Sequence, residues 1–224
     1  MECYGQFCPV ALAADVVTRR WTPLLLRELL YGSHRFNDLH RGLPRISRTL
    51  LSQRLGELEE AGVVERRFSG GHPEYHLTEA GNQLWPVIVE LGIWGKRWAR
   101  APSSADLDPG FLLWDIQRRV LREHLPPNPV LVHFRFVEGG TAPRSYWLLL
   151  RREGVEMHTD DPGGDVGMEV ETDVRTLTAI WMGDLELEDA VRRDTLRLRG
   201  ASELREPFPE WLGSNLFAGY PRAR

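Results

Sequence analysis

Hydrophobic residues in the first sixty positions recur with helical spacing, and turn-forming residues interrupt them at short intervals. The predicted helices cover residues 10–21, 23–32, 36–43 and about 48–61. Pro23 is placed to begin the second helix and Gly32 to end it. Pro44 breaks the chain after the third, and Ser47 is placed to cap the fourth. The pattern therefore predicts four short helices in succession.

The periodicity changes after Gly62, which is placed to stop the fourth helix. Residues 63–78 contain two strand-like runs around Ser-Gly-Gly-His-Pro, a sequence typical of a hairpin. Thr78 then caps a predicted long helix over roughly 79–100, with Glu79 in its first turn. The segment from residue 35 onward therefore predicts a helix, a tight turn, a second helix and a two-stranded wing.

A cluster of Pro, Ser, Asp and Gly at residues 99–110 predicts a linker. We therefore expect a first domain at 1–100, a linker at 101–110 and a second domain at 111–224. Beyond the linker, helices are predicted at 111–125, 174–183, 186–193 and around 209–217, and strands at 130–137, 145–152, 154–159, 167–172 and 195–199. Mixed strands and helices make the second domain α+β or α/β, so the whole chain is predicted as two-domain α+β.

Composition places the chain among ordinary globular proteins, because 42% of its 224 residues are hydrophobic and 27% are charged. No apolar run approaches the roughly 18 residues of a membrane span, and the first ten residues do not resemble a signal peptide. We therefore expect a cytoplasmic protein with no membrane partner. The chain has 27 arginines and one lysine, Lys96, a ratio for which the sequence offers no physical account.

The formal net charge of −4 is unevenly distributed. Residues 1–101 carry 13 Lys+Arg against 11 Asp+Glu, whereas residues 102–224 carry 15 against 21. Within residues 35–67, five of seven arginines fall in the first twenty positions beside a single acid, Asp38. The other acids follow late, at Glu57, Glu59, Glu60 and Glu65. One end of this segment is therefore predicted to meet a polyanion and the other is not.

The fourth helix has one apolar stripe, formed by Leu51, Leu55 and Leu58, which is predicted to pack inward. The opposite face carries small and polar residues, and this arrangement suits a helix that enters the DNA major groove by its N-terminal end. Gln can recognise adenine and Arg guanine by paired hydrogen bonds. The candidate DNA-binding residues are Arg35, Ser47, Arg48, Thr49, Ser52, Gln53, Arg54, Arg66, Arg67 and His72. A solvated amphipathic helix with incidental arginines is the alternative.

Several motifs in residues 3–100 together resemble the HxlR-type winged helix-turn-helix family of bacterial transcription regulators. They are Cys-Pro-Val at 8–10, Arg-Trp-Thr at 20–22, Arg-Phe-Asn-Asp-Leu at 35–39, Ile46-Ser47 with Leu50, the run from Gln53 to Glu59, and Glu-Tyr-His-Leu-Thr at 74–78. The resemblance implies a homodimer that binds a pseudo-palindromic operator. Some members use a cysteine in this position as a redox switch, which makes Cys8 a candidate sensor. An inert small apolar residue is the alternative.

The second half resembles a sterol-carrier-protein type 2 domain over roughly residues 111–218. The matching features are Asp173 and Leu177 at a helix start, Gly183-Asp184, a strand ending at Gly200, and opening strands within 133–158. The resemblance implies an apolar cavity for lipids or other hydrophobic molecules. Asp194 stands where that family often has glycine, which leaves the turn geometry open. The candidate effector-binding residues are Trp147, Leu149, Ile180, Trp181 and Trp211, with a plain hydrophobic core as the alternative.

A heptad-like stripe on the long helix, formed by Val87, Leu91, Trp94 and Trp98, is a candidate dimerisation seam. Packing on the domain's own core is the alternative. No GxSxG, HExxH, GxGxxG or Walker loop is present, so we expect neither an enzyme nor a cofactor. His72 and His76 fall in the predicted wing and are interpreted as exposed residues there, so no metal site is assigned.

These observations favour a regulator that binds operator DNA as a homodimer and responds to a hydrophobic small molecule in its second domain. Two alternatives stay open. One keeps DNA binding and makes Cys8 the sensor. The other is a lipid-binding carrier or enzyme in which the first half serves only for assembly.

Overall fold

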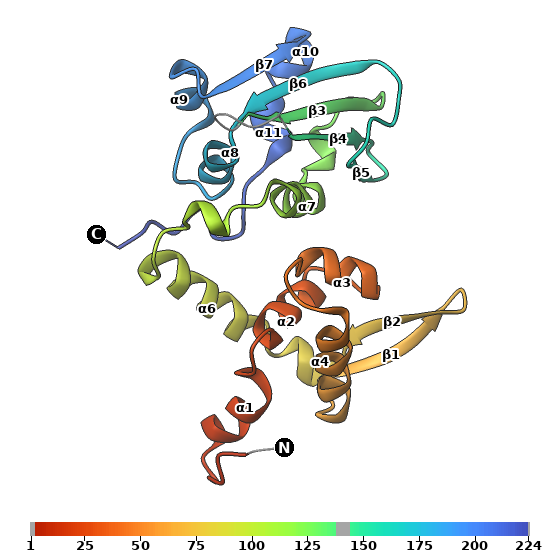
Figure 1. Ribbon diagram of the computed structural model, residues 1–224, viewed down its shortest axis with the longest axis vertical. Coiled ribbons are helices and arrows are strands. Elements are labelled where there is room, and N and C mark those ends of the chain that lie inside the picture. Colours follow the sequence, from red (N-terminus) through yellow and green to blue (C-terminus); the bar gives the residue numbers. More distant parts are fainter. Residues whose placement is uncertain (1–2, 138–143, 224) are drawn as a thin grey trace. The chain divides into compact units, whose positions relative to one another are not determined.

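The computed structural model describes residues 3–137 and 144–223, and it divides into two compact units, Met1–Trp94 and Gly95–Arg224 (Figure 1). The first unit contains α1 (Pro9–Val17), α2 (Thr22–Leu30), α3 (Phe36–Gly42), α4 (Arg48–Glu60), β1 (Val64–Ser69), β2 (His72–Leu77), α5 (Glu79–Asn82) and the first part of α6 (Trp85–Trp98). The second contains the end of α6 and everything that follows. Each unit has its own hydrophobic core.

In the first unit, α4 forms and packs as its sequence predicts. The Ser47 hydroxyl accepts a hydrogen bond from the Leu50 amide at 3.2 Å and caps the helix. Leu51, Leu55 and Leu58 are buried in the core. The strands β1 and β2 pair antiparallel in the register Val64↔Leu77 to Ser69↔His72. Gly70 and Gly71 join them with φ of 57° and 79°, the left-handed conformation that a tight two-residue hairpin turn needs.

The prediction of one long helix over residues 79–100 is wrong, because the structure has two. Thr78 does act as a cap, and its hydroxyl accepts from the Gly81 amide at 3.2 Å. The first helix, α5, ends at Asn82, however, and α6 begins at Trp85. Pro86 explains the break, since it has no amide hydrogen for the carbonyl four residues earlier and its ring would collide with that carbonyl. The predicted helix at 10–21 also ends early, at Val17.

The second unit is built on a five-stranded mixed sheet in the order β5-β4-β3-β6-β7. Its strands are β3 (Val130–Phe136), β4 (Arg144–Leu150), β5 (Val155–His158), β6 (Val166–Thr172) and β7 (Leu196–Gly200). Its helices are α7 (Pro109–Arg119), α8 (Val174–Trp181), α9 (Leu187–Arg192), α10 (Ser202–Arg205) and α11 (Phe208–Leu212), with the 3-10 turns η1 (Ser104–Asp106) and η2 (Arg122–His124). The pair β3 and β6 is parallel, and the other pairs are antiparallel. The opening strands expected from the sterol-carrier resemblance included residues 138–140, which lie outside the described residues.

Two local predictions for this unit need correction or completion. The helix predicted at 111–125 ends at Arg119, because the chain turns extended at Val120 and the Leu121 amide donates instead to the Trp211 carbonyl at 2.9 Å. The turn left open at Asp194 is left-handed, with φ of 57°. The Asp194 carboxylate accepts from Nε of Arg197 at 2.6 Å, which ties this turn to β7.

Helices cover one face of the sheet and form the hydrophobic core with it, whereas the opposite face lies outside that core. Val132, Phe134 and Phe136 of β3 form one hydrophobic core with buried residues of α7, α8 and α11. Their neighbours on β3, His133 and Arg135, alternate to the opposite face. That face carries cross-strand ion pairs, including Arg199–Glu169 at 2.7 Å and Arg135–Glu171 at 2.7 Å.

A buried carboxylate joins three segments of the second unit. Asp115 of α7 accepts from the Trp181 indole at 2.8 Å and from the Asn215 side-chain amide at 3.0 Å. Arg118, one turn along α7, donates to it at 3.1 Å. Because all these donors meet in one shielded place, Asp115 holds α8 and the segment after α11 against α7.

Replacing Asp115 by Ala is expected to destabilise the second unit by roughly 2–4 kcal/mol, because the buried indole and amide would lose their acceptor. Urea unfolding of the full chain would measure this change. Asp165→Ala, at an exposed position directly before β6, is the matched control and should cost well under 1 kcal/mol. Equal stability of the two variants would contradict the central place given to Asp115.

Candidate nucleic-acid interface

The outward face of α4 is polar along the first half of the helix. Thr49, Ser52 and Gln53 are exposed, on the side opposite the buried leucines. Nε2 of Gln53 donates to Oε1 of Glu57 at 3.0 Å, one turn further along the helix. The face therefore presents hydroxyl and amide groups that can form hydrogen bonds to the edges of bases.

Arg48 places a cation at the start of this face. Its Nη1 donates to Oδ1 of Asn37 at 3.1 Å, and its guanidinium lies 5.8 Å from the centre of the Phe36 ring. Among the described residues these partners are both neutral, so the charge of Arg48 is not cancelled by an acid. The partial positive charge at the N-terminus of α4 adds to it, and both favour a phosphate at this end of the helix.

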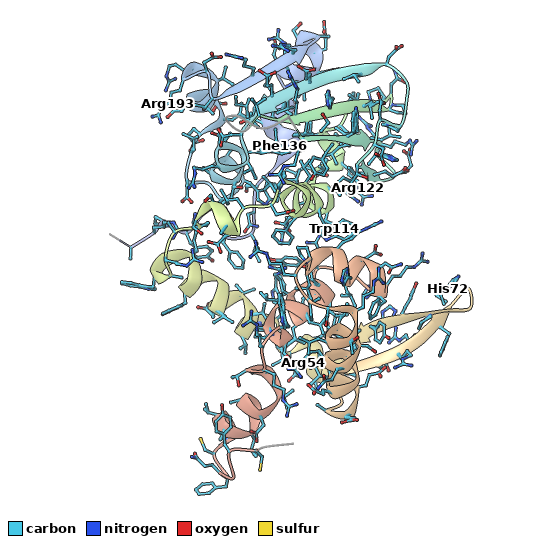
Figure 2. All side chains as sticks on the ribbon, viewed as in Figure 1. Arg54, His72, Trp114, Arg122, Phe136 and Arg193 are labelled. Carbon is cyan, nitrogen blue, oxygen red and sulfur yellow. The ribbon has the colours of Figure 1, made fainter. Side chains whose placement is uncertain are left out.

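Arg54, which the sequence placed among the DNA-binding candidates, is engaged inside the first unit (Figure 2). Its Nε donates to the Arg20 carbonyl at 3.1 Å and its Nη1 to Glu57 at 2.6 Å. Its side chain is only 16% exposed. Arg54 therefore ties α4 to the segment before α2. Its side chain is directed into the first unit, unlike those of Thr49, Ser52 and Gln53.

Glu57 is the centre of a small ionic cluster between α1 and α4. Its carboxylate lies 3.1 Å from Nη1 of Arg19, in addition to the bonds from Arg54 and Gln53. The pKa of this carboxyl lies below its ordinary value. Burial alone would raise that pKa, but the hydrogen bonds from Arg54, Gln53 and Arg19 outweigh it by favouring the charged form. Glu57, one of the late acids of the segment, thus has cations of the same unit as partners.

The wing carries its own ion pairs near its base. Arg66 forms two hydrogen bonds to Glu59, at 3.1 Å and 2.8 Å, and Arg67 donates from Nε to Glu65 at 2.8 Å. His72 lies near the tip of the hairpin and is exposed (Figure 2).

The wing is also attached to the segment that leads into α3. Nε of Arg35 lies 3.4 Å from Glu74. The rings of His34 and His76 stack with their centres 4.2 Å apart. Arg35 is therefore held beside the wing, and its side chain is 64% exposed.

Apolar side chains line the exposed surface of α6. Val87, Leu91, Trp94 and Trp98 are all more than half exposed. Exposed apolar residues that the sequence analysis did not single out also lie at the N-terminus, at Tyr4, Phe7, Val10 and Leu12. None of the residues of α1 is buried, and a short helix with apolar residues on most sides gives no sequence signal of this.

The five candidate effector-binding residues do not come together. Ile180, Trp181 and Trp211 belong to the buried core between the sheet and the helices. Trp147 and Leu149 alternate to the other face of the sheet, where the Trp147 ring stacks on His133 with centres 4.8 Å apart. A single cavity lined by all five is therefore wrong, because the sheet itself lies between the two groups.

Cys3 and Cys8 are unpaired and exposed. Within residues 3–137 and 144–223, no cluster of three or more His, Cys, Asp or Glu side chains is placed to hold a metal ion. None of the described helices combines the length and apolar character that crossing a membrane requires.

The helices α3 and α4 with the wing β1–β2 define a winged helix-turn-helix protein. A family model described as HxlR-like helix-turn-helix matches residues 16–103. The chain is 38% identical over 112 residues to the uncharacterized HTH-type transcriptional regulator YvaP of Bacillus subtilis (strain 168), covering 48% of this chain and 96% of that protein. The chain belongs to the HxlR-like family of transcriptional regulators.

Further similar proteins cover the same part of the chain. The HTH-type transcriptional regulator YdeP of Bacillus subtilis (strain 168) is 37% identical over 94 residues, covering 41% of this chain and 73% of that protein. The solved structure of the redox regulator HypR in its reduced form is 34% identical, covering 39% of this chain and 90% of that chain, with a TM-score of 0.37. Family membership therefore rests on sequence identity in the first half of the chain.

Lowering the pH is expected to weaken the Glu57 cluster. Because the folded-state pKa is depressed, the stabilisation is present above the unfolded pKa of about 4.3 and is lost as the pH falls through the lower folded value. Glu57→Gln should therefore destabilise the chain at pH 7, on the order of 1 kcal/mol, and by less near pH 3. Urea unfolding at the two pH values tests this, with Glu60→Gln on the same helix as the control. If Glu57→Gln destabilised the chain equally at both pH values, the charged carboxylate of Glu57 would not be the stabilising group.

Proposed function

We propose that the chain is a homodimeric regulator in which the exposed face of α4 contacts operator DNA in the major groove. The observation that carries the proposal is the combination on one helix end of an unneutralised Arg48, a capped N-terminus and outward polar side chains. Family membership supports a role in transcription. Glu57 and Glu59, further along α4, are bound by cations of the same unit, so they repel DNA less than their charge implies.

The DNA-binding candidates divide by their structural position. Gln53, Thr49 and Ser52 occupy the outward face and are assigned to base contacts, and Gln53 would exchange its bond to Glu57 for one to a base. Arg35 and His72 are exposed near the wing and are assigned to phosphates. Arg66 and Arg67 are also assigned to phosphates, although each must share its charge with a glutamate.

The exposed apolar surface of α6 is proposed as the dimer seam. Val87, Leu91, Trp94 and Trp98 recur with the spacing of a helix–helix contact, and a second copy would cover them by the same surface. The exposed N-terminal residues Phe7 and Val10 are a further apolar surface that a second copy can bury. Two copies would place two α4 helices on a pseudo-palindromic site.

The second unit is proposed to bind a hydrophobic effector, in keeping with its resemblance to sterol-carrier domains. A redox-controlled alternative follows from Cys8, whose exposed thiol directly precedes α1. The two modes separate by chemistry. Only in the redox mode would Cys8→Ser abolish the effect of an oxidant on DNA binding, and would a thiol reductant reverse that effect in the unchanged chain. A carrier or enzyme without DNA binding would show no salt-dependent affinity for duplex DNA.

Gln53→Ala is expected to relax base preference at one operator position by about 1–3 kcal/mol, and Arg48→Ala to act likewise beside it. Arg66→Ala and Arg67→Ala should weaken binding to all sequences and reduce its salt dependence. A duplex selected from a randomised pool and its single-base variants provide the measurement. Gln83→Ala, an exposed glutamine at the end of α5, is the control. Unchanged preference in Gln53→Ala would mean that another face of α4 meets the DNA.

Replacing Trp94 and Trp98 together by Ala is expected to produce monomers and to abolish tight operator binding, since each monomer contacts one half-site only. Sedimentation velocity without DNA reports the oligomeric state. Phe68→Ala, which removes an equally exposed aromatic residue from the wing, should leave the dimer intact. A dimer that persists in the double variant would place the seam elsewhere, with the residues before α2 as the next candidates.

A further inference from the structure

A surface pocket of about 210 Å³ opens in the second unit between the α8–α9 connection and the end of α11. It is lined by Ile180, Gly183, Leu185, Glu186, Leu187, Glu188, Pro209, Leu212, Gly213 and Ser214. Ile180, Leu187 and Leu212 belong to the core of the unit, so they contribute apolar atoms to the floor of a pocket whose lining as a whole is more polar than apolar. Only one of the five effector candidates chosen from the sequence, Ile180, takes part in it.

The charged residues of this lining are both acids. Glu186 and Glu188 are exposed, and within residues 3–137 and 144–223 no arginine, lysine or histidine forms an ion pair with either. A mixed floor with some apolar side chains beside an anionic rim favours a cation that carries a small apolar group and disfavours a fatty acid carboxylate. Since a cavity of about 150 Å³ accommodates benzene, this pocket has room for one ring with a short chain.

The wall of the pocket is bonded directly to α6. Nζ of Lys96 donates to the Met182 carbonyl at 2.9 Å and to Oδ1 of Asp184 at 2.5 Å. Gly183, which lies between these two residues, lines the pocket. The Lys96 side chain is 2% exposed, and a compact ammonium is suited to a carbonyl and a carboxylate at one point. The only lysine of the chain is therefore placed where α6 meets the pocket wall.

The segment after α11 holds this wall from the other side. Gly183 has φ of 69°, and a Cβ there would lie 2.7 Å from the Ala218 carbonyl oxygen. The Asn215 amide donates to the Trp181 carbonyl at 2.9 Å, and the Ala223 amide donates to the Arg97 carbonyl of α6 at 2.9 Å. A ligand that displaces the 182–184 turn therefore acts on the bonds that hold the end of α6.

We propose that this pocket binds a small apolar ammonium ion and that Lys96 connects its occupancy to α6. The proposal rests on the proposed function, because it supplies the site and chemical class of the effector. It changes the expected ligand from a lipid or other hydrophobic molecule to a single ring bearing a positive charge.

Calorimetric titration of the full chain with three probes of the same ring and similar length tests the binding step. The probes are 2-phenylethylammonium, 2-phenylethanol and 3-phenylpropionate. At low salt the cation should bind about three- to tenfold tighter than the alcohol, and the carboxylate weakest, with the preference falling as salt screens the rim. Equal affinities for cation and carboxylate, or no binding by any probe, would overturn the proposal.

Matched variants locate the site. Glu186→Gln with Glu188→Gln should remove the preference for the cation. Glu203→Gln on α10 with Glu206→Gln directly after it should retain the preference. Ser214→Trp, which fills the pocket from an exposed position, should abolish binding of all three probes. Retained selectivity in the first pair would place the cation elsewhere and overturn the assignment.

Amide hydrogen exchange measures the connection to α6. 2-Phenylethylammonium should change exchange across the end of α6, and Asp184→Asn or Lys96→Met should remove that change without preventing probe binding. Probe binding with no effect on α6 would overturn the role of Lys96. Affinity for the selected duplex without any probe is measured in parallel. If the chain has no affinity for the duplex, DNA binding itself is contradicted. If the chain binds the duplex with an affinity that the probe does not change, only this inference is contradicted.

Discussion

Burial of Leu51, Leu55 and Leu58 is the constraint on which the rest of the first unit depends. These three side chains determine the rotation of α4 about its axis, because no other face of the helix is apolar enough to enter the core. Once the rotation is set, Thr49, Ser52 and Gln53 must point outward. A rotation by one residue would bury polar groups without partners, at a cost comparable to the stability of a small domain.

The same rotation separates two kinds of arginine on α4. Arg48 comes before the first buried leucine and turns toward Asn37, where no acid neutralises it. Arg54 adjoins Leu55 and is directed toward Glu57 and the Arg20 carbonyl. Residues of identical chemistry thus serve different purposes, since one contributes charge to an outward surface and the other stabilises the packing of α4.

The helix α6 carries buried residues at some positions and large exposed apolar residues at others. Ile88 packs in the core of the first unit, and Lys96 is bonded within the second. Between and around them, Trp94 and Trp98 expose large apolar area to water, a feature typical of surfaces that bind a partner. A buried ammonium at the end of such a helix has few alternative positions, because removing it from its carbonyl and carboxylate would leave a charge unpaired.

The local pattern of the sequence was enough to predict the wing, the cap at Ser47, the inward leucines and most strands, because each depends on residues close together in the chain. It also predicted which residues of α4 face outward, since helical periodicity alone decides this. Tertiary structure decided the rest. The alternation of β4 directs Trp147 to the face of the sheet opposite the core that holds Trp181 of α8, and only the pairing of strands and the packing of helices reveal which side is the core. Likewise, nothing near Lys96 in the sequence points to Asp184, because their contact is made by segments 88 residues apart that only folding brings together.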